Sequence, residues 1–172
     1  CIYNNQVRTG QNLQTDTLKR LADLPTIISV KDASGNILQM SDIIEQIGRK
    51  SPHFSVLSGD DPFTYPLMTL GGHGVISTAS NLTPQPIIDL IQAAQVYDLD
   101  KAKNLHYQLS PLFKALSLET NPIPIKAAMH LCGMPSGACR LPLCDLEHSH
   151  FEKLKHLVNN LPKEWLGEYG QS

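Results

Sequence analysis

The first half of the chain alternates short apolar runs with amphipathic segments. The apolar runs are rich in β-branched residues and lack polar alternation, which is typical of strands covered on both faces. We expect strands in the opening residues through Tyr3 and at 26–30, 54–59 and 74–78. Apolar residues at helical spacing predict helices at 15–24, after Ser41 as an N-cap, from Asp60 to the glycines at 71–72, and from Pro84.

The second half of the chain has the helical period alone. Leucines recur at 105, 109, 112 and 116, a helix is expected to include 126–131, and a last one to span about 147–160. The leucine row is more typical of a core or a subunit interface than of a ligand site. We therefore divide the chain into a strand-helix part, residues 1–98, and a helical C-terminal extension, residues 99–172.

The alternation of strands and helices defines an α/β fold with parallel strands and right-handed crossovers. Four such strands form either a small doubly wound sheet or half of a closed eight-stranded barrel. A complete barrel takes about 250 residues, against 172 here. The chain opens at Cys1 directly in strand-like residues, and the barrel interpretation expects further sequence upstream.

Composition narrows the choice of partners. The formal charge is -2, and no run of Lys or Arg is long enough to follow a phosphate backbone, so we expect neither nucleic acid nor a membrane as a partner. A small neutral or anionic ligand fits better. No apolar stretch of spanning length and no signal peptide is visible, and the four cysteines lack a CxxC pair. These features predict a cytoplasmic protein with free thiols and no metal site.

Polar or reactive residues gather where the expected strands end, the edge at which parallel α/β folds place their sites. They are Tyr3, Arg8, Lys31, Gly59, Asp60 and Ile76. A lysine that ends a buried strand is partly desolvated, which favours the neutral amine and makes it a nucleophile toward carbonyl groups. On position alone, a lysine that reaches from the strand end to solvent is the commoner explanation.

Five motifs in a fixed order favour the catalytic interpretation of Lys31 over the solvent-exposed one. They are YNNQVRTG from Tyr3, SVKDASGN from Ser29, LSGDD from Leu57, GGHGVIS from Gly71 and NPIPIK from Asn121. In order and spacing they resemble the dihydrodipicolinate synthase family, within the pyruvate-dependent class I aldolases, from the first residue to about Leu161. The resemblance implies the second half of a (β/α)8 TIM barrel, strands five to eight, followed by a helical extension.

The resemblance also implies the chemistry. It suggests that pyruvate condenses with L-aspartate 4-semialdehyde to give 4-hydroxy-tetrahydrodipicolinate in lysine and diaminopimelate biosynthesis, without a cofactor, in a homo-oligomer. Lys31 resembles the Schiff-base lysine, Tyr3 the proton-relaying tyrosine, and Arg8 the arginine that holds the carboxylate of the second substrate. Gly59 and Asp60 are similar to the part that meets the aldehyde, and Ile76 to a residue whose main-chain carbonyl positions the pyruvate side.

Some alternatives stay open. A lyase of the N-acetylneuraminate type shares the barrel and the lysine, but the RTG that contains Arg8 favours the synthase. A non-catalytic barrel remnant is the other alternative. Gln6 stands where the family usually has proline, which predicts a looser loop around Arg8. Several family contacts belong to upstream sequence, so we expect this chain alone to be inactive or barely active.

Overall fold

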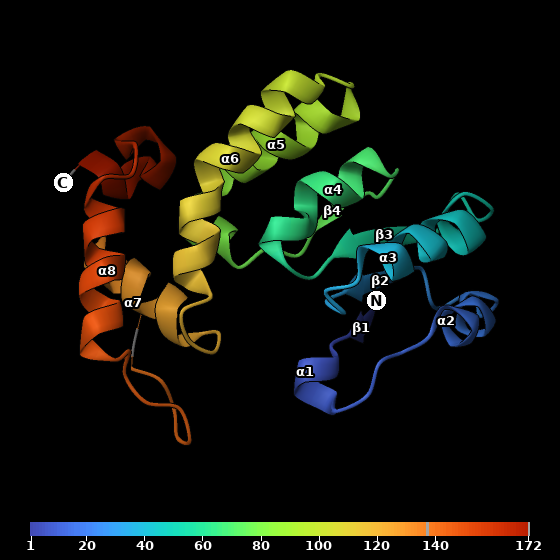
Figure 1. The fold of residues 1–172 in the computed structure, drawn as a ribbon, viewed down its shortest axis with the longest axis horizontal. Helices are drawn as coiled ribbons and strands as arrows, with labels where there is room; N and C mark the ends of the chain where they lie inside the picture. The colour runs from blue at the N-terminus through green and yellow to red at the C-terminus, as the bar shows by residue number, and fades with distance from the viewer. Residues whose placement is uncertain (137, 172) are drawn as a thin grey trace. The chain divides into compact units, whose positions relative to one another are not determined.

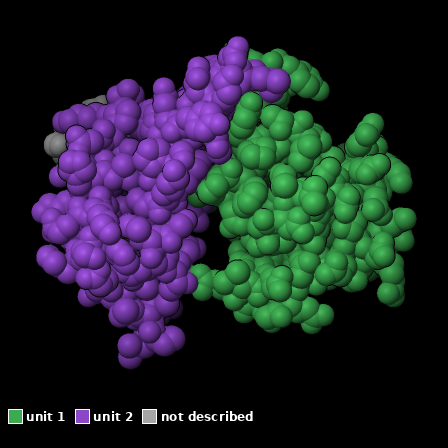
Figure 2. All heavy atoms as spheres, in the orientation of Figure 1, with its two compact units in different colours: residues 1–77, 94–98 green, residues 78–93, 99–172 purple. Residues whose placement is uncertain are grey.

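The computed structural model describes residues 1–136 and 138–171, with side chains up to residue 167. These residues form two compact units, coloured separately in Figure 2: residues 1–77 with 94–98, and residues 78–93 with 99–172. Among the described residues, no helix combines the length and the apolar character needed to cross a membrane.

The first unit is built on a parallel sheet in which each strand pairs with the next one in sequence. Its strands are β1 (Ile2–Asn4), β2 (Ser29–Asp32), β3 (Ser55–Ser58) and β4 (Gly74–Val75). The helices between them are α1 (Gln6–Thr9), α2 (Thr15–Ala22), α3 (Ile37–Ile43), the π-helix η1 (Ile44–Gly48), the 3₁₀ helix η2 (Asp61–Phe63) and α4 (Thr64–Thr69). The strand-helix alternation is labelled in Figure 1.

The strand order separates the two architectures left open by the sequence. A doubly wound sheet reverses its order at a switch point, whereas here the order β1-β2-β3-β4 runs in one direction. That progression is the one found in barrels, so the doubly wound alternative is wrong. The structure is a partial α/β barrel.

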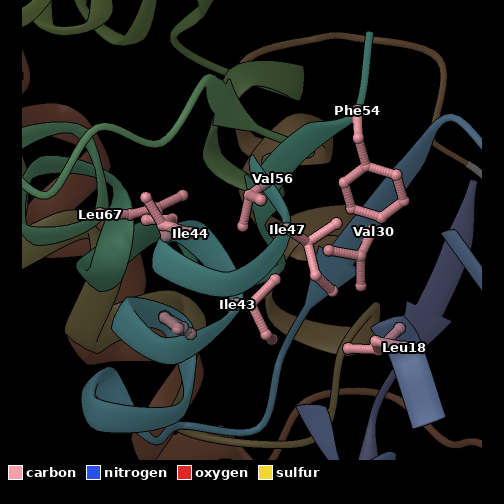
Figure 3. Packing of buried hydrophobic residues seen from close by; sticks show 9 residues of the cluster. Leu18, Val30, Ile43, Ile44, Ile47, Phe54, Val56 and Leu67 are labelled. Atoms are coloured by element: carbon pink, nitrogen blue, oxygen red, sulfur yellow. The ribbon is translucent and has the colours of Figure 1, made fainter. Parts of the chain in front are cut away.

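The core of the first unit lies between the sheet and its helices. Val30 and Val56 are register partners on β2 and β3, and both are fully buried on the helix side of the sheet. Figure 3 shows their side chains directed toward isoleucines 43, 44 and 47 of α3 and η1. The remaining members of the core are Leu18, Met40, Phe54 and Leu67. Each fully buried aliphatic side chain stabilises the fold by about 1.5–3 kcal/mol.

Three predicted boundaries in this unit are wrong. The fourth strand was expected at 74–78, but β4 spans only Gly74–Val75. The second strand was expected at 26–30, but Ile27 N donates to Leu24 O at 2.9 Å in a turn after α2, so pairing starts later, at Ser29. Helix α3 does not start after Ser41. The side chain of Asn36 accepts from Leu38 N and Gln39 N, which caps the helix one turn earlier.

Helices make up the second unit. They are η3 (Ala79–Asn81), α5 (Pro84–Gln95), α6 (Leu99–Leu116), α7 (Ile123–Leu131), α8 (His148–Asn159) and η4 (Lys163–Gln171). The last two residues of α5 belong to the first unit. Helices α6, α7 and α8 pack against one another. Of the predicted leucine row, Leu109, Leu112 and Leu116 are buried in this unit, which confirms that they belong to a core.

Candidate functional site

Tyr3 and Lys31 lie side by side on adjacent strands. The two residues are register partners in the parallel pairing of β1 with β2, so their side chains leave the same face of the sheet. The Lys31 Nζ atom lies 4.2 Å from the centroid of the Tyr3 ring, a cation–π contact. Both residues sit inside their strands, one position before the last residue, and not after the strands as expected.

Alternation along β1 and β2 separates two environments. The next residues, Asn4 and Asp32, point to the opposite face and are buried, whereas Lys31 is half-buried and Tyr3 is exposed. The face that carries the amine and the phenol is therefore open to small molecules. The opposite face is packed against helices.

Asn5 connects Tyr3 to the helix that carries Arg8. Its Nδ2 donates to the Tyr3 hydroxyl oxygen at 2.6 Å, and its Oδ1 accepts from Arg8 N at 3.2 Å, the N-cap bond of α1. The phenol oxygen thus has a fixed donor, and its own proton remains able to transfer. The sequence interpretation missed Asn5, although its position before the RTG segment fits an N-cap.

Gly59 and Asp60 follow β3 directly. Gly59 N donates to Asp32 O at 2.6 Å, and a Cβ on Gly59 would lie 2.6 Å from Ala33 Cβ. No side chain fits there without displacement. Next to it, the Ser58 hydroxyl donates to Asp60 O at 2.7 Å, so the chain turns tightly at the end of the strand.

The Asp60 carboxyl has an unusual environment. Burial raises its pKa above 3.8, the charge of Asp61 acts in the same direction, and the positive charge of Lys31 opposes them. This carboxyl is therefore within electrostatic reach of the Lys31 ammonium. Perturbed carboxyl groups of this kind are common in functional sites.

Ile76 completes the predicted set on the next strand along. It follows β4, and its N–H donates to Ser58 O at 2.9 Å, which places it beside the end of β3. The structure thus places five of the six residues at or just after the carboxyl ends of four neighbouring strands, with Tyr3 and Lys31 in direct contact. Arg8 lies on α1, and the Asn5 side chain connects its backbone N–H to the Tyr3 hydroxyl.

Behind the reactive pair lies a buried network that the sequence interpretation did not find. Asp32 is completely buried, and its carboxylate accepts from Asn4 Nδ2 at 2.9 Å, Ser34 N at 3.0 Å, Ser34 Oγ at 2.5 Å and Gln39 Nε2 at 3.4 Å. Asn12 bridges Asn4 and Gln39 at 2.9 and 2.7 Å. These donors satisfy the oxygens of a carboxyl group that is removed from water.

The network fixes the residues next to the reactive pair. Asn4 follows Tyr3 and Asp32 follows Lys31, so the bond between these two side chains locks the strand pair from behind. Leu13 N also donates to Asn4 Oδ1 at 2.9 Å, which ties the loop before α2 to the strand. Side-chain hydrogen bonds on this face therefore join the two strands at the residues that follow Tyr3 and Lys31.

The arrangement is suited to carbonyl chemistry. A primary amine next to a phenol combines a nucleophile with a proton donor and acceptor, which imine formation needs. No group of three or more His, Cys, Asp or Glu side chains suited to a metal ion occurs within residues 1–136 and 138–171.

Sequence comparison gives a consistent family. Residues 1–161 match the family described as "Dihydrodipicolinate synthetase family". A 4-hydroxy-tetrahydrodipicolinate synthase of Protochlamydia amoebophila is 52% identical over 166 residues, which cover 96% of this chain and 55% of that protein. The enzyme of the same name from Methanoculleus marisnigri is 45% identical over 159 residues, 92% of this chain and 54% of that protein.

Solved structures agree. The dihydrodipicolinate synthase of Aquifex aeolicus is 40% identical with a TM-score of 0.87, covering 92% of this chain and 53% of its own. The 4-hydroxy-tetrahydrodipicolinate synthase of Methylacidiphilum fumariolicum is 37% identical with a TM-score of 0.87, covering 98% of this chain and 55% of its own. The chain thus spans about half the length of the relatives that it matches.

Proposed function

The chain belongs to the dihydrodipicolinate synthetase family, and from this premise we propose that it supplies the Schiff-base lysine of a 4-hydroxy-tetrahydrodipicolinate synthase. The substrates are pyruvate and L-aspartate 4-semialdehyde. The observation that carries the proposal is the contact between Lys31 and Tyr3, with Nζ 4.2 Å from the ring centroid on the open face of the sheet.

The reaction starts at the Lys31 amine. The neutral amine attacks the ketone carbon of pyruvate, and Tyr3 passes protons to the carbinolamine oxygen, which leaves as water. The resulting imine loses a methyl proton to give an enamine, whose carbon adds to the aldehyde of the second substrate. The amino group of that substrate then displaces Lys31 and closes the ring, which frees the lysine without a metal ion or nucleotide.

The other residues have supporting roles in this proposal. Arg8 holds the carboxylate of the semialdehyde, since a guanidinium donates two parallel hydrogen bonds. Gly59 and Asp60 line the aldehyde side, and the main-chain carbonyl of Ile76 positions the pyruvate side. The position of Arg8 on α1, whose cap Asn5 also contacts the phenol of Tyr3, supports a shared site.

We also propose the molecular context. The four strands are half of a closed eight-stranded barrel, and the motif order supports their assignment as the fifth to the eighth, with the helices from residue 99 as the C-terminal extension. The active form is a homo-oligomer in the cytoplasm. Four free cysteines suit a reducing compartment.

A chimaeric enzyme tests the proposal. Residues 1–161 replace the matched segment of the Methanoculleus marisnigri enzyme, and the chimaera is assayed for condensation of pyruvate with the semialdehyde and for cleavage of N-acetylneuraminate. We expect the condensation only, and its loss in a folded chimaera with Lys31→Arg. A folded chimaera without condensation activity, or with the lyase activity, would contradict the proposal.

A further inference from the structure

The loop between α7 and α8 carries chemistry that the synthase reaction does not use. In Figure 1 this orange loop runs out from α7 and returns to α8. It contains Cys139 and Cys144, both free thiols. Both line one cavity of about 480 Å³, together with Lys126 and His130 of α7 and Phe151 of α8.

A tight turn lies between the two cysteines. Leu143 N donates to Arg140 O at 3.0 Å, so Arg140 and Leu143 are the ends of a four-residue turn, and the cysteines are the residues that flank it. The Cα atoms at the two ends of such a turn lie less than about 7 Å apart, and the cysteines next to those ends line the same cavity. Disulfides need roughly 4.4–6.8 Å between Cα atoms.

The base of the loop is fixed and its tip is accessible. Ser136 Oγ donates to Lys126 O at 2.8 Å, and Lys126 Nζ donates to Ala138 O at 2.8 Å. On the other side, Glu147 N donates to Glu119 Oε1 at 2.9 Å. At the tip, Leu141 is 91% exposed. Small oxidants can therefore reach thiols whose backbone positions are held.

We propose that Cys139 and Cys144 are an oxidation site at which a peroxide forms a reversible disulfide. One thiolate attacks the peroxide and becomes a sulfenic acid, releasing one water. The second thiol attacks the sulfenic sulfur and releases another water, so two thiols are oxidised while one peroxide is reduced. A dithiol reductant restores both thiols.

The surroundings favour oxidation of Cys139 and Cys144 over oxidation of Cys132, the third cysteine of the unit. The side chain of Lys126 lines the same cavity as both thiols and donates to the carbonyl of Ala138, the residue before Cys139. His130 and Asp145 also face the cavity. By contrast, burial raises the pKa of Cys132, which lowers its thiolate fraction.

The sequence allows a direct test on the 172-residue chain. Hydrogen peroxide is added in slight excess, remaining thiols are alkylated, and the chain is digested with trypsin without reductant. Trypsin cuts after Arg140, between the two cysteines, so we expect the peptides 127–140 and 141–153 to be joined. Reduction before digestion separates them.

Variants and fragmentation assign the bond. Because peptide 127–140 also contains Cys132, fragmentation of the linked peptide in the unsubstituted chain locates the sulfur, independent of how variants fold. We expect Cys132→Ser to keep the link, and Cys139→Ser and Cys144→Ser each to abolish it. A link to Cys132, or separate alkylated peptides while the exposed Cys1 is oxidised, would overturn the proposal.

Discussion

At the residue scale, Asp32 supports the strand pair that carries Tyr3 and Lys31, although it has no role in the proposed reaction. Replacement by leucine removes one of the acceptors of the buried Asn4 amide and the acceptor of the Ser34 backbone N–H and hydroxyl. The loss of hydrogen bonds to a charged group and the burial of donors without a partner both destabilise the fold. We therefore expect Asp32→Leu to lower the free energy of unfolding by about 3 kcal/mol. Urea denaturation measures this change.

The matched control for Asp32 is Asp42→Leu, which alters an exposed carboxylate on α3. Its effect should stay within about 0.5 kcal/mol, as for surface substitutions in general. Equal effects of the two substitutions would show that the buried network does not stabilise the strand pair.

Gly59 tests the tight turn after β3. Its added methyl group in Gly59→Ala would meet Ala33 Cβ at 2.6 Å and Asp32 O at 3.0 Å. We expect a loss of about 1–3 kcal/mol from overpacking. The double variant Gly59→Ala with Ala33→Gly removes the closest contact and should recover part of that loss. Additive thermal shifts in this double-mutant cycle would rule out the steric explanation.

Some of the site could be predicted residue by residue, because Lys31 and Tyr3 lie near strand ends in recognisable motifs. The network behind them could not. Asn4 and Asp32 are 28 positions apart, and Asn12 and Gln39 are 27 apart. Such partners are set by the register of β1 with β2 and by the packing of α3, neither of which local spacing fixes.

At the scale of elements, α1 offers a test of the unusual Gln6. This residue is the first of α1 and follows the cap Asn5, whose φ of -145° and ψ of 89° lie outside the α region that is disfavoured for a residue before proline. Proline at the first helical position has a suitable φ, so we expect Gln6→Pro to raise the free energy of unfolding by about 0.4–1 kcal/mol.

Gln6→Ala is the control for α1, because it changes the side chain without fixing φ. Chemical denaturation of both variants compares them. Destabilisation by proline would mean that Gln6 has a backbone conformation different from the one that the family's proline adopts.

The start of α8 predicts a pH dependence. Glu147 caps this helix by accepting from Ser149 N, Ser149 Oγ and His150 N. The bonds from the Ser149 side chain and backbone lower the pKa of Glu147 from 4.5 to about 2. An acidic group whose pKa is lower in the folded than in the unfolded chain stabilises the fold at pH values above its unfolded pKa. The contribution of Glu147 is therefore complete above about pH 4.5 and is lost as the pH falls toward 2.

We therefore expect Glu147→Gln to flatten the part of the pH–stability profile between pH 2 and 4.5. Thermal melts across that range measure it. Glu152→Gln, an exposed residue within α8, serves as the control and should leave the profile unchanged. Identical profiles for wild type and Glu147→Gln would refute the assignment of the cap.

Element boundaries show where sequence reasoning reaches its limit. The apolar period located α2, α4 and α6 because each buries one stripe of side chains. It placed the start of α3 one turn late, since Asn36 lies in a segment, KDASGN, whose composition is also typical of a loop. The hydrogen bonds of the Asn36 side chain make this residue the start of a helix and not part of a loop, and these bonds depend on tertiary context.

At the scale of the whole molecule, the sheet has two unpaired edges, at β1 and β4. Its open face also exposes Tyr3 and Ile76 by 50% and 43%. The sequence predicted the alternation of strands and helices because each crossover is local, but the residues alone left the order of the strands open between a doubly wound sheet and a barrel. Whether the boundary at residue 98 separates independent domains stays a prediction.

These features support the expectation that the 172-residue chain has little or no condensation activity by itself. An assay of purified chain with pyruvate and the semialdehyde measures it. Turnover near that of a relative such as the Methanoculleus marisnigri enzyme would show that the site needs no further strands.

The most direct test of the central claim is covalent trapping at Lys31. Pyruvate and borohydride are added to the chain, and the reduced adduct is mapped after trypsin, which no longer cuts between Lys31 and Asp32, so that residues 21–49 stay in one peptide. The account predicts that Lys31 is labelled ahead of the exposed Lys19 and Lys50. Labelling of Lys31 no faster than of those two lysines would contradict it.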